Sequence, residues 1–580
     1  MKTVWSYCRP YKISAAIALF FMIAELVVEL VQPLLMAKII NNGIMVKNLE
    51  VVAIWGGIIL ALSLLGFLSG IMNTYYASHV SQSFGADIRK NVFEKVQSFS
   101  YAQFSLFAAG SLMTRLTNDV QQLQNTMFMG LRIMARAPLL IFGGLIMAFI
   151  VHPSLAVYLA VVVPCLFLFL VFFMGKGGRM FKVVQEKLDE VNNVMGENLA
   201  GMKLIRAFLR KSHEVSRFED ASEQLRKKTA SVLQFMEISM PALLFLMNAA
   251  TICILWFGNQ EITVGTANVG EVVAVVNYAT RITGSLSVLS FIIMAFSRSR
   301  ASAARLNEVL NAPEEMEDHE DTFKIEAMRG DICFENVSFR YVGQSFSALD
   351  HVSFSLKAGC TMAILGSTGS GKSTLVNMIP RLYDPSEGRI TIDGIDLREY
   401  DQRMLRRQIG LVPQEPLLFT GSVVENIRWG KRNASKEEVV KACKDAQIYE
   451  TVMKLPQQMD TKIGQKGVNL SGGQRQRLSI ARALVRKPRI LLFDDSTSAL
   501  DVKTEMELLQ ALKAYRGTKL IVTQKISTAI HADLIMLLQD GKKAAIGTHQ
   551  ELMESSALYR EIIQSQGGER RSVYVEKANK

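Results

Sequence analysis

The sequence predicts a two-part fold: an α-helical transmembrane domain of six spans with long cytoplasmic helical extensions, followed by an α/β domain with a phosphate-binding loop. Six long apolar stretches fall in about the first 300 residues. Further on, the strand-like run Met362–Leu365 leads directly into the glycine-rich sequence Gly366–Ser373. The chain has 580 residues, which is also more than one ordinary domain.

The composition agrees with a chain that lies partly in lipid. Hydrophobic residues make up 49% and charged residues 20%, with a mean hydropathy of +0.20, which argues against a purely soluble or disordered protein. The net charge of +12 fits either nucleic acid or an anionic membrane surface. The six cysteines are scattered without metal-ligand spacing and are interpreted as reduced packing residues.

Each of the six apolar stretches is long enough for a helix that crosses a hydrocarbon core about 30 Å thick. Any one of them also fits a buried core helix, but six together would leave too little polar surface to cover them. The predicted spans are residues 14–36, 51–77, 127–150, 154–174, 239–258 and 272–296.

The distribution of lysine and arginine predicts the orientation. The connections after the second and fourth spans are rich in basic residues, whereas the turn at His152 and the stretch 258–270 contain none. By the positive-inside bias, we expect both termini and both long connections to be cytoplasmic. The expectation is a multi-pass cell-membrane protein of bacterial type that binds no nucleic acid, with its first apolar segment retained as an anchor rather than cleaved.

The two basic connections are about 50 and 60 residues long and have helical apolar spacing. We expect helices that continue into the cytosol, with short crossing elements at Phe104–Ala109 and Ala207–Lys211 that could contact a cytoplasmic domain. The alternative for these two segments is a solvated surface loop.

Ionisable residues inside the spans are costly unless they are paired or face a cavity. One interpretation is a substrate pathway that attracts cations; the other is an interhelical ion pair that holds the bundle together. Both stay open for the same five residues, which are Glu25, Glu29, Arg132, Arg136 and Arg281.

The character of the chain changes after residue 310. The sequence predicts a membrane domain over 1–310, an acidic linker over 311–329, a soluble domain over 330–566 and a polar tail over 567–580. The soluble domain carries a complete GxxxxGK[ST] loop, in which glycines let backbone N–H groups surround phosphates. Its residues are Gly366, Ser367, Thr368, Gly369, Ser370, Gly371, Lys372 and Ser373.

Nucleotide binding follows from that loop. Lys372 is expected to reach the phosphate oxygens and Ser373 to hold Mg²⁺ together with Asp494, which ends an apolar strand. A second glycine-rich turn precedes a basic helix and would be redundant around one nucleotide, unless two chains sandwich each nucleotide. That turn comprises Leu470, Ser471, Gly472, Gly473 and Gln474.

With this LSGGQ sequence downstream of a phosphate loop, nearly the whole chain resembles the ATP-binding cassette family, in its exporter-type half-transporter form. The resemblance implies ATP and Mg²⁺ as cofactors, adenine stacking on Tyr341, and Mg²⁺ sensing by Gln414. It also implies that the segment Ser498–Asp501 is the D-loop, with Asp501 among the catalytic positions. One chain would then be half a transporter.

Two positions depart from the family pattern at the catalytic step. The usual glutamate is Asp495, one methylene shorter, and the usual switch histidine is Gln524. We expect slow hydrolysis at this chain's own site and a heterodimer with a paralogous half-transporter that carries Glu and His. The alternative is that both changes are tolerated in a homodimer. Gln465, where exporters generally carry Glu, puts one charged contact to the membrane domain in doubt.

The function expected from the resemblance is ATP-driven export of hydrophobic or amphipathic compounds, of the multidrug type, by alternating access. Its partners would be the paralogous chain, membrane lipid and a small hydrophobic substrate. The alternatives are a homodimeric lipid or peptide exporter, an importer of the siderophore type, and an ATP-gated channel.

Overall fold

The computed structural model describes residues 2–313 and 328–566, which form two compact units. The membrane unit comprises the residues up to Ser98 together with Ala109–Ala312. The ATPase unit comprises Phe99–Ala108 and the chain from Pro313 onward. Most of the expected linker, 314–327, and the expected polar tail, 567–580, lie outside the described residues.

Six helical segments of the membrane unit are long and apolar enough to cross a bilayer, counted over the described residues. Five of them contain a predicted span in full, and the sixth, Val269–Leu289, contains most of the span predicted at 272–296. The predicted fold class is therefore confirmed on the membrane side. Most of these segments run well past the apolar stretches: α3 covers Leu49–Gln97, α8 covers Pro153–Ala200 and α10 covers Lys211–Val264. The other long helices are α2 (Lys12–Lys38), α7 (Arg136–Val151) and α11 (Val269–Leu310).

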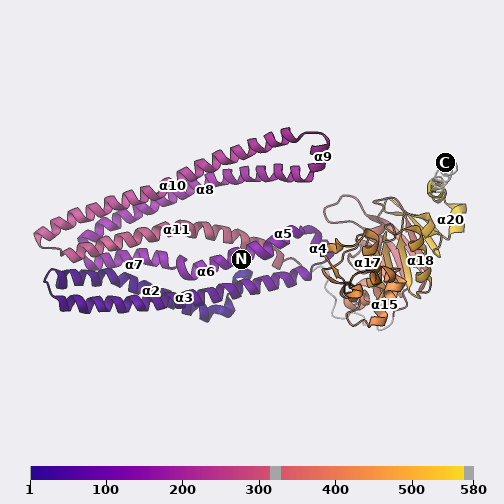
Figure 1. The fold of residues 1–580 in the computed structure, drawn as a ribbon, viewed down its shortest axis with the longest axis horizontal. Coiled ribbons are helices and arrows are strands. Elements are labelled where there is room, and N and C mark those ends of the chain that lie inside the picture. Colours follow the sequence, from indigo (N-terminus) through magenta and orange to yellow (C-terminus); the bar gives the residue numbers. More distant parts are fainter. Residues whose placement is uncertain (1, 314–327, 567–580) are drawn as a thin grey trace. The chain divides into compact units, whose positions relative to one another are not determined.

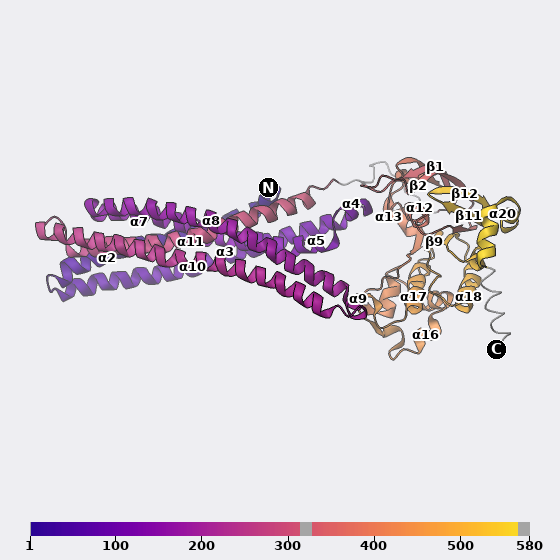
Figure 2. The same ribbon diagram turned by 90° about the horizontal axis from the view of Figure 1, so that it is seen from above.

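Helices α8 and α10 pack along each other as a hairpin with α9 (Met202–Ala207) at its tip (Figures 1 and 2). The predicted crossing element Ala207–Lys211 is therefore placed too late by about one turn. Gly201 ends α8 and starts α9, while Leu209 adopts a left-handed φ of 55° and separates α9 from α10.

The third membrane segment alternates between α-helix and π-helix. Its π-turn η3 carries Asp119, which binds Arg305 of α11 with both oxygens and accepts a hydrogen bond from Ser302 at 2.8 Å. Arg115 of η3 pairs with Glu308 at 2.9 Å. The segment is built from α5 (Ala109–Thr114), η3 (Arg115–Asp119), α6 (Val120–Met129), η4 (Gly130–Met134) and α7; the remaining short elements are α1 (Lys2–Ser6), η1 (Arg9–Tyr11) and η2 (Ile39–Ile44).

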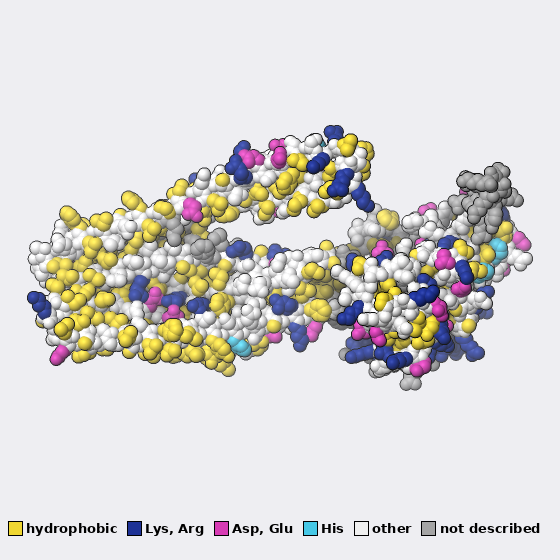
Figure 3. Space-filling view, viewed as in Figure 1, with side chains coloured by type: hydrophobic (Ala, Val, Ile, Leu, Met, Phe, Trp, Pro, Cys, Tyr) yellow, Lys and Arg dark blue, Asp and Glu magenta, His cyan; other side chains and the backbone are white. Residues whose placement is uncertain are grey.

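Large apolar side chains cover the outer surface of the membrane unit, as expected for helices that face lipid (Figure 3). They include exposed residues of α3, α7, α8 and α10, among them Leu60, Phe142, Phe172 and Phe245. The chain is thus a multi-pass membrane protein.

The ATPase unit contains a six-stranded sheet in the order β12-β11-β3-β10-β9-β6, in which the first pair is antiparallel and the other pairs are parallel. An antiparallel sheet, β2-β1-β4-β5, packs against it through a shared apolar core. The strands are β1 (Ile332–Phe339), β2 (Leu349–Leu356), β3 (Thr361–Leu365), β4 (Glu387–Ile392), β5 (Ile395–Asp396), β6 (Ile409–Val412), β7 (Gly421–Ser422), β8 (Lys462–Ile463), β9 (Ile490–Asp494), β10 (Thr518–Val522), β11 (Leu534–Gln539) and β12 (Lys542–Gly547).

A second core joins the sheet to a group of helices that carries the LSGGQ turn. These buried parallel strands end toward the phosphate loop, the edge at which ligands bind in α/β sheets. The α-helices of this unit are α4 (Tyr101–Leu106), α12 (Lys372–Met378), α13 (Gln402–Gln408), α14 (Val423–Arg428), α15 (Lys436–Asp445), α16 (Tyr449–Met453), α17 (Gly472–Leu484), α18 (Val502–Lys513), α19 (Ile526–Ala529) and α20 (His549–Ser555), with 3-10 turns η5 (Leu397–Glu399), η6 (Gln458–Asp460) and η7 (Gln465–Gly467). Residues 557–566 are also helical.

Candidate functional site

The phosphate loop lies between buried β3 and α12, as the sequence predicts. Gly369 and Gly371 both have left-handed backbones, with φ of 84° and 96°. A side chain on Gly371 would place its Cβ 2.3 Å from the carbonyl oxygen of Ala348, so only glycine fits there. The loop is therefore shaped by its glycines into a cradle of backbone N–H groups.

Lys372 lies inside this loop. Its Nζ donates to the carbonyl oxygens of Gly366 and Ser367 at 2.9 and 2.6 Å, and it lies 3.4 Å from Oγ of Ser370. Burial lowers the pKa of Lys372, and the carboxylates of Asp495 and Asp494 oppose that shift. A buried ammonium group held at a phosphate loop is suited to neutralise phosphate oxygens.

The expected Mg²⁺ ligands are adjacent in the structure. Ser373 donates from Oγ to Oδ1 of Asp494 at 2.7 Å, across the gap between α12 and the end of β9. Burial raises the pKa of Asp494, while the hydrogen bond from Ser373 and the charge of Lys372 act in the opposite direction. A hydroxyl and a carboxylate oxygen side by side are the hard ligands that Mg²⁺ prefers, so the donor set fits the ion.

A cavity of about 570 Å³ opens beside the loop and brings the predicted nucleotide-binding residues together. Tyr341 lies at its edge, where its hydroxyl is 3.0 Å from Oγ1 of Thr374 and its ring packs edge-on against Phe339 and Tyr383. The predicted residues that line it are Tyr341, Thr368, Gly369, Gly371, Lys372, Ser373, Gln414, Asp495 and Gln524.

Asp495 and Gln524 face each other in this cavity. Nε2 of Gln524 lies 3.5 Å from Oδ2 of Asp495, and Asp495 has a left-handed φ of 45°. Burial raises the pKa of Asp495; the charge of Lys372 acts against that shift and that of Asp494 adds to it. The two residues that depart from the family pattern are thus side by side at the place where hydrolysis would occur.

The switch loop that carries Gln524 is held by residues that the sequence did not reveal. Lys525 donates to buried Glu505 at 2.8 Å, and Thr528 donates to the other oxygen of Glu505 at 2.6 Å. Gln566 donates to the carbonyl oxygen of Gln524 at 2.7 Å and accepts from the backbone of Ile526 at 2.9 Å. These contacts join segments distant in sequence, and no spacing rule predicts them.

The LSGGQ turn is outside the cavity. Ser471 caps α17 in a reciprocal arrangement with Gln474, and Leu470 is buried beneath it. Ser471 and Gly472 are exposed, and a side chain on Gly472 would meet no atom within 4 Å. Asp501 caps α18 by accepting from the backbone and hydroxyl of Thr504 at 2.9 and 2.8 Å. Within the described residues, the LSGGQ turn, which we also call the signature, is exposed and does not line the chain's own nucleotide cavity.

Residues 99–108 belong to the ATPase unit although they fall between the second and third membrane spans. Their helix α4 begins at Tyr101, after a capping box of Ser100 and Gln103, a few residues before the predicted Phe104. The ring of Tyr101 packs against Tyr383 at 5.9 Å, and Gln103 donates to the carbonyl oxygen of Pro313. Tyr383 was missed because an isolated tyrosine gives no sequence signal.

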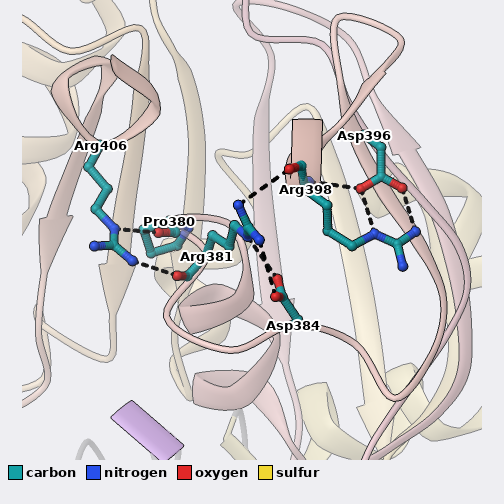
Figure 4. Close-up of polar contacts among 6 residues, drawn as sticks. All are labelled: Pro380, Arg381, Asp384, Asp396, Arg398 and Arg406. Atoms are coloured by element: carbon teal, nitrogen blue, oxygen red, sulfur yellow. Dashed lines mark hydrogen bonds and ion pairs between the residues drawn. The ribbon is translucent and has the colours of Figure 1, made fainter. Parts of the chain in front are cut away.

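The loop that carries Tyr383 is held by arginines (Figure 4). Arg406 donates to the carbonyl oxygens of Pro380 and Arg381 at 3.0 and 2.7 Å. Arg381 turns back to bind Asp384 at 3.0 Å. This network fixes a backbone in which Arg381 has a left-handed φ of 51°.

The five ionisable residues of the spans line one cavity of about 810 Å³ between α2, α3, η4, α7 and α11. Arg136 binds Glu25 at 2.8 Å and Glu29 at 2.6 Å, and Arg281 lies 3.4 Å from Glu29. The structure therefore contains the interhelical ion pairs of one interpretation, and the residues that form them also line a cavity, as the other interpretation requires. Figure 3 shows a small group of acidic and basic side chains in an otherwise apolar face of the membrane unit.

Comparison with known proteins agrees with both units. The family model described as ABC transporter transmembrane region matches residues 15–286, and the model described as ABC transporter matches residues 349–498. The ABC transporter ATP-binding protein YfiB of Bacillus subtilis (strain 168) is 53% identical and aligned over 98% of this chain and 99% of its own length. The putative multidrug export ATP-binding/permease protein YgaD of the same organism is 30% identical, over 97% and 98%.

A solved structure has the same fold. A bacterial Atm1-family ABC exporter with ATP bound superimposes with a TM-score of 0.80 at 25% identity, covering 96% of this chain and 98% of the other. Together with the phosphate loop and the six spans, these similarities show that the chain belongs to the ABC transporter family, with a transmembrane domain and an ATPase domain of exporter fold fused in one polypeptide.

Proposed function

We propose that this chain is one half of a heterodimeric exporter that moves hydrophobic or amphipathic compounds out of the cell at the expense of ATP. Its partner is a paralogous half-transporter with Glu and His at the two catalytic positions. The observation that carries the proposal is the pairing of Asp495 with Gln524 inside the nucleotide cavity, beside intact Lys372 and Ser373.

This pairing separates nucleotide binding from hydrolysis. The phosphate loop, Lys372 and the Ser373–Asp494 pair are all present, so ATP and Mg²⁺ bind. The carboxylate of Asp495 is one methylene short of the usual glutamate and faces an amide. Since a displacement of about 1 Å in a reacting group can cost about 100-fold in rate, hydrolysis here is slow.

The exposed LSGGQ turn supplies the complementary role. With Ser471 and Gly472 on a free surface, this chain completes the nucleotide site on the partner, where hydrolysis takes place. ATP binding closes the two cassettes, and turnover at the partner's site resets the transport cycle. Export of the multidrug type is supported by the similarity to the putative multidrug export protein YgaD and by the exporter fold.

ATP turnover of the purified complex tests the proposal. We expect Asp495→Glu with Gln524→His to add a second active site and raise turnover, whereas loss of the partner's glutamate abolishes it. Adding Lys372→Ala to the double exchange should remove the gain, which assigns it to this chain's site. Brisk hydrolysis by this chain alone, with no response to the double exchange, would show that the proposed asymmetry is wrong.

A further inference from the structure

We propose that the cavity between α2, α3, η4, α7 and α11 binds an amphiphile with an acidic headgroup, and that Arg132 holds the anionic group. The proposal rests on the export function proposed above and names the chemical class of its substrate. It begins from the charge of the cavity lining, which contains three arginines and two glutamates.

The two glutamates are already engaged. Arg136 bridges Glu25 and Glu29 at 2.8 and 2.6 Å, and Arg281 lies 3.4 Å from Glu29 while donating to Gln32 at 2.9 Å. A cationic ligand would meet carboxylates whose charge is already balanced by the guanidinium groups of Arg136 and Arg281. The geometry therefore argues against the cation-attracting role that the sequence left open for Glu25 and Glu29.

Arg132 is the fifth charged residue of the lining, and it takes no part in these ion pairs. It is half-buried in the same lining, and no residue of the described chain forms a hydrogen bond or an ion pair with it. A guanidinium group within a membrane span is costly unless an anion, water or a polar cavity accompanies it. Its planar array of donors matches the oxygens of phosphate, sulfate or carboxylate.

The backbone at Arg132 is irregular and is held in place. Arg132 is the central residue of the π-helical turn η4, and such turns are frequent at functional sites. Buried Asn73 of α3 donates to the carbonyl oxygen of Leu131 at 3.3 Å and to that of Ala18 in α2 at 2.7 Å. A side chain from one helix thus ties the turn next to Arg132 to a second helix, which positions Arg132 at the cavity.

The rest of the lining suits an apolar chain. Val28, Phe67, Ile71 and Tyr75 lie along the same cavity. Glu25 is near the middle of α2, so the charged part of the lining lies at the depth of the hydrocarbon core. A ligand with one acidic group and one alkyl or aromatic chain satisfies both parts of the lining.

Binding to the full-length chain in phosphatidylcholine nanodiscs tests this assignment without ATP. The probes are dodecyl phosphate, dodecyltrimethylammonium and inorganic phosphate, and the readouts are equilibrium binding and thermal stabilisation. We expect dodecyl phosphate to bind, and Arg132→Gln to weaken it about tenfold or more, as expected for loss of a charge-assisted hydrogen bond. Arg9→Gln, an exposed arginine outside the cavity, should bind as the native chain does.

Two further variants keep the result interpretable. Arg132→Lys retains the charge and should keep most of the binding even if Arg132→Gln folds poorly. Glu25→Gln removes a competing carboxylate and should strengthen binding of dodecyl phosphate. Preference for dodecyltrimethylammonium, equal binding to native chain and Arg132→Gln, or equally tight binding of inorganic phosphate alone would each overturn the proposal. If dodecyl phosphate binds as expected but the complex does not transport it when ATP is supplied, the result counts against the export function and not against this binding site.

Discussion

Asp494 and Asp495 are consecutive carboxylic acids at the end of a buried strand, and both interact with the ammonium group of Lys372 in the phosphate loop. Burial raises the pKa of both acids. Ionising either acid therefore costs more free energy in the folded protein than in the unfolded chain. Such a cost is typical of a site that is organised to bind a cation rather than to stabilise the fold.

Asp494→Asn should raise the stability of the nucleotide-free protein while it weakens binding of Mg²⁺ and ATP. The amide oxygen still accepts from Ser373, but the buried charge is gone. Because the folded-state pKa is raised, the benefit is present above that pKa and disappears as the pH falls toward the ordinary value of 3.8. Melting temperatures at pH 7 and pH 4, with and without Mg²⁺-ATP, measure both effects.

Ser373→Ala is the matched control, since it removes the neutral partner and leaves the acid in place. It should lower the melting temperature at pH 7, because Asp494 then loses the hydrogen bond that favours its ionised form. If Asp494→Asn destabilises the nucleotide-free protein at pH 7, burial of its charge is not a cost to the fold.

At the scale of elements, the loop after α12 depends on arginine donors rather than on apolar packing (Figure 4). Arg406 donates two hydrogen bonds to main-chain carbonyl oxygens of this loop, and its removal would take both donors away. Arg398 pairs with Asp396 at 2.6 Å, but its side chain is about half exposed. Arg406 thus holds the backbone of the loop, whereas Arg398 forms a half-exposed ion pair in the same region.

Arg406→Met should destabilise the ATPase unit by about 1–3 kcal/mol, the usual cost of leaving buried polar groups without partners. Arg398→Met should cost less than about 1 kcal/mol, as expected for an exposed ion pair. Chemical denaturation of the full-length chain, followed by the fluorescence of Trp429 with the other tryptophans replaced, gives the comparison. Equal effects of the two changes would contradict the assignment of Arg406 as the residue that holds this loop.

The sequence predicts elements well where periodicity or a motif is strong. The six spans fall in six helices, and the phosphate loop lies between a strand and a helix. The short elements were placed less well: α9 ends at Ala207, where the predicted element begins. The start of α4 was readable from the capping box at Ser100, whereas the π-turns of the third segment have no sequence signature.

For the nucleotide site, the residues expected to bind nucleotide could be predicted from the sequence, but the residues that hold them in place could not. Lys372, Ser373 and Asp495 follow from motifs that local chemistry requires. Glu505 and Gln566, which hold the switch loop, come from helices distant in sequence and bind through ordinary side chains. Such contacts depend on tertiary packing, and a single sequence carries no record of them.

At the scale of the whole molecule, the two halves of a nucleotide site lie on different surfaces of one chain. The phosphate loop lines a cavity, and the signature turn at Gly472 points to solvent. Under the proposed function, a second chain is needed, because the LSGGQ turn of each chain completes the site at the phosphate loop of the other. The charge and size of residue 472 should therefore matter to the partner's site more than to this chain.

Gly472→Glu should lower ATP turnover of the heterodimer at least tenfold, because a carboxylate would then face the phosphates of the partner's nucleotide. The fold should tolerate it, since the position is open and an acidic residue suits a helix N-terminus. ATP binding and melting temperature of this chain should stay unchanged. The same change at the partner's signature is the control and should have the smaller effect; the reverse order would show that hydrolysis occurs on this chain.

The grouping of residues 99–108 with the ATPase unit affects how this transporter can be recombined with its relatives. A chimera that exchanges only the chain from residue 313 onward would pair the native Tyr101 with a foreign residue at position 383. Exchange of 99–108 together with that region keeps the aromatic pair and the bond from Gln103 to Pro313 intact. The interchangeable ATPase module of this protein is therefore discontinuous in the gene, although it is one body in space.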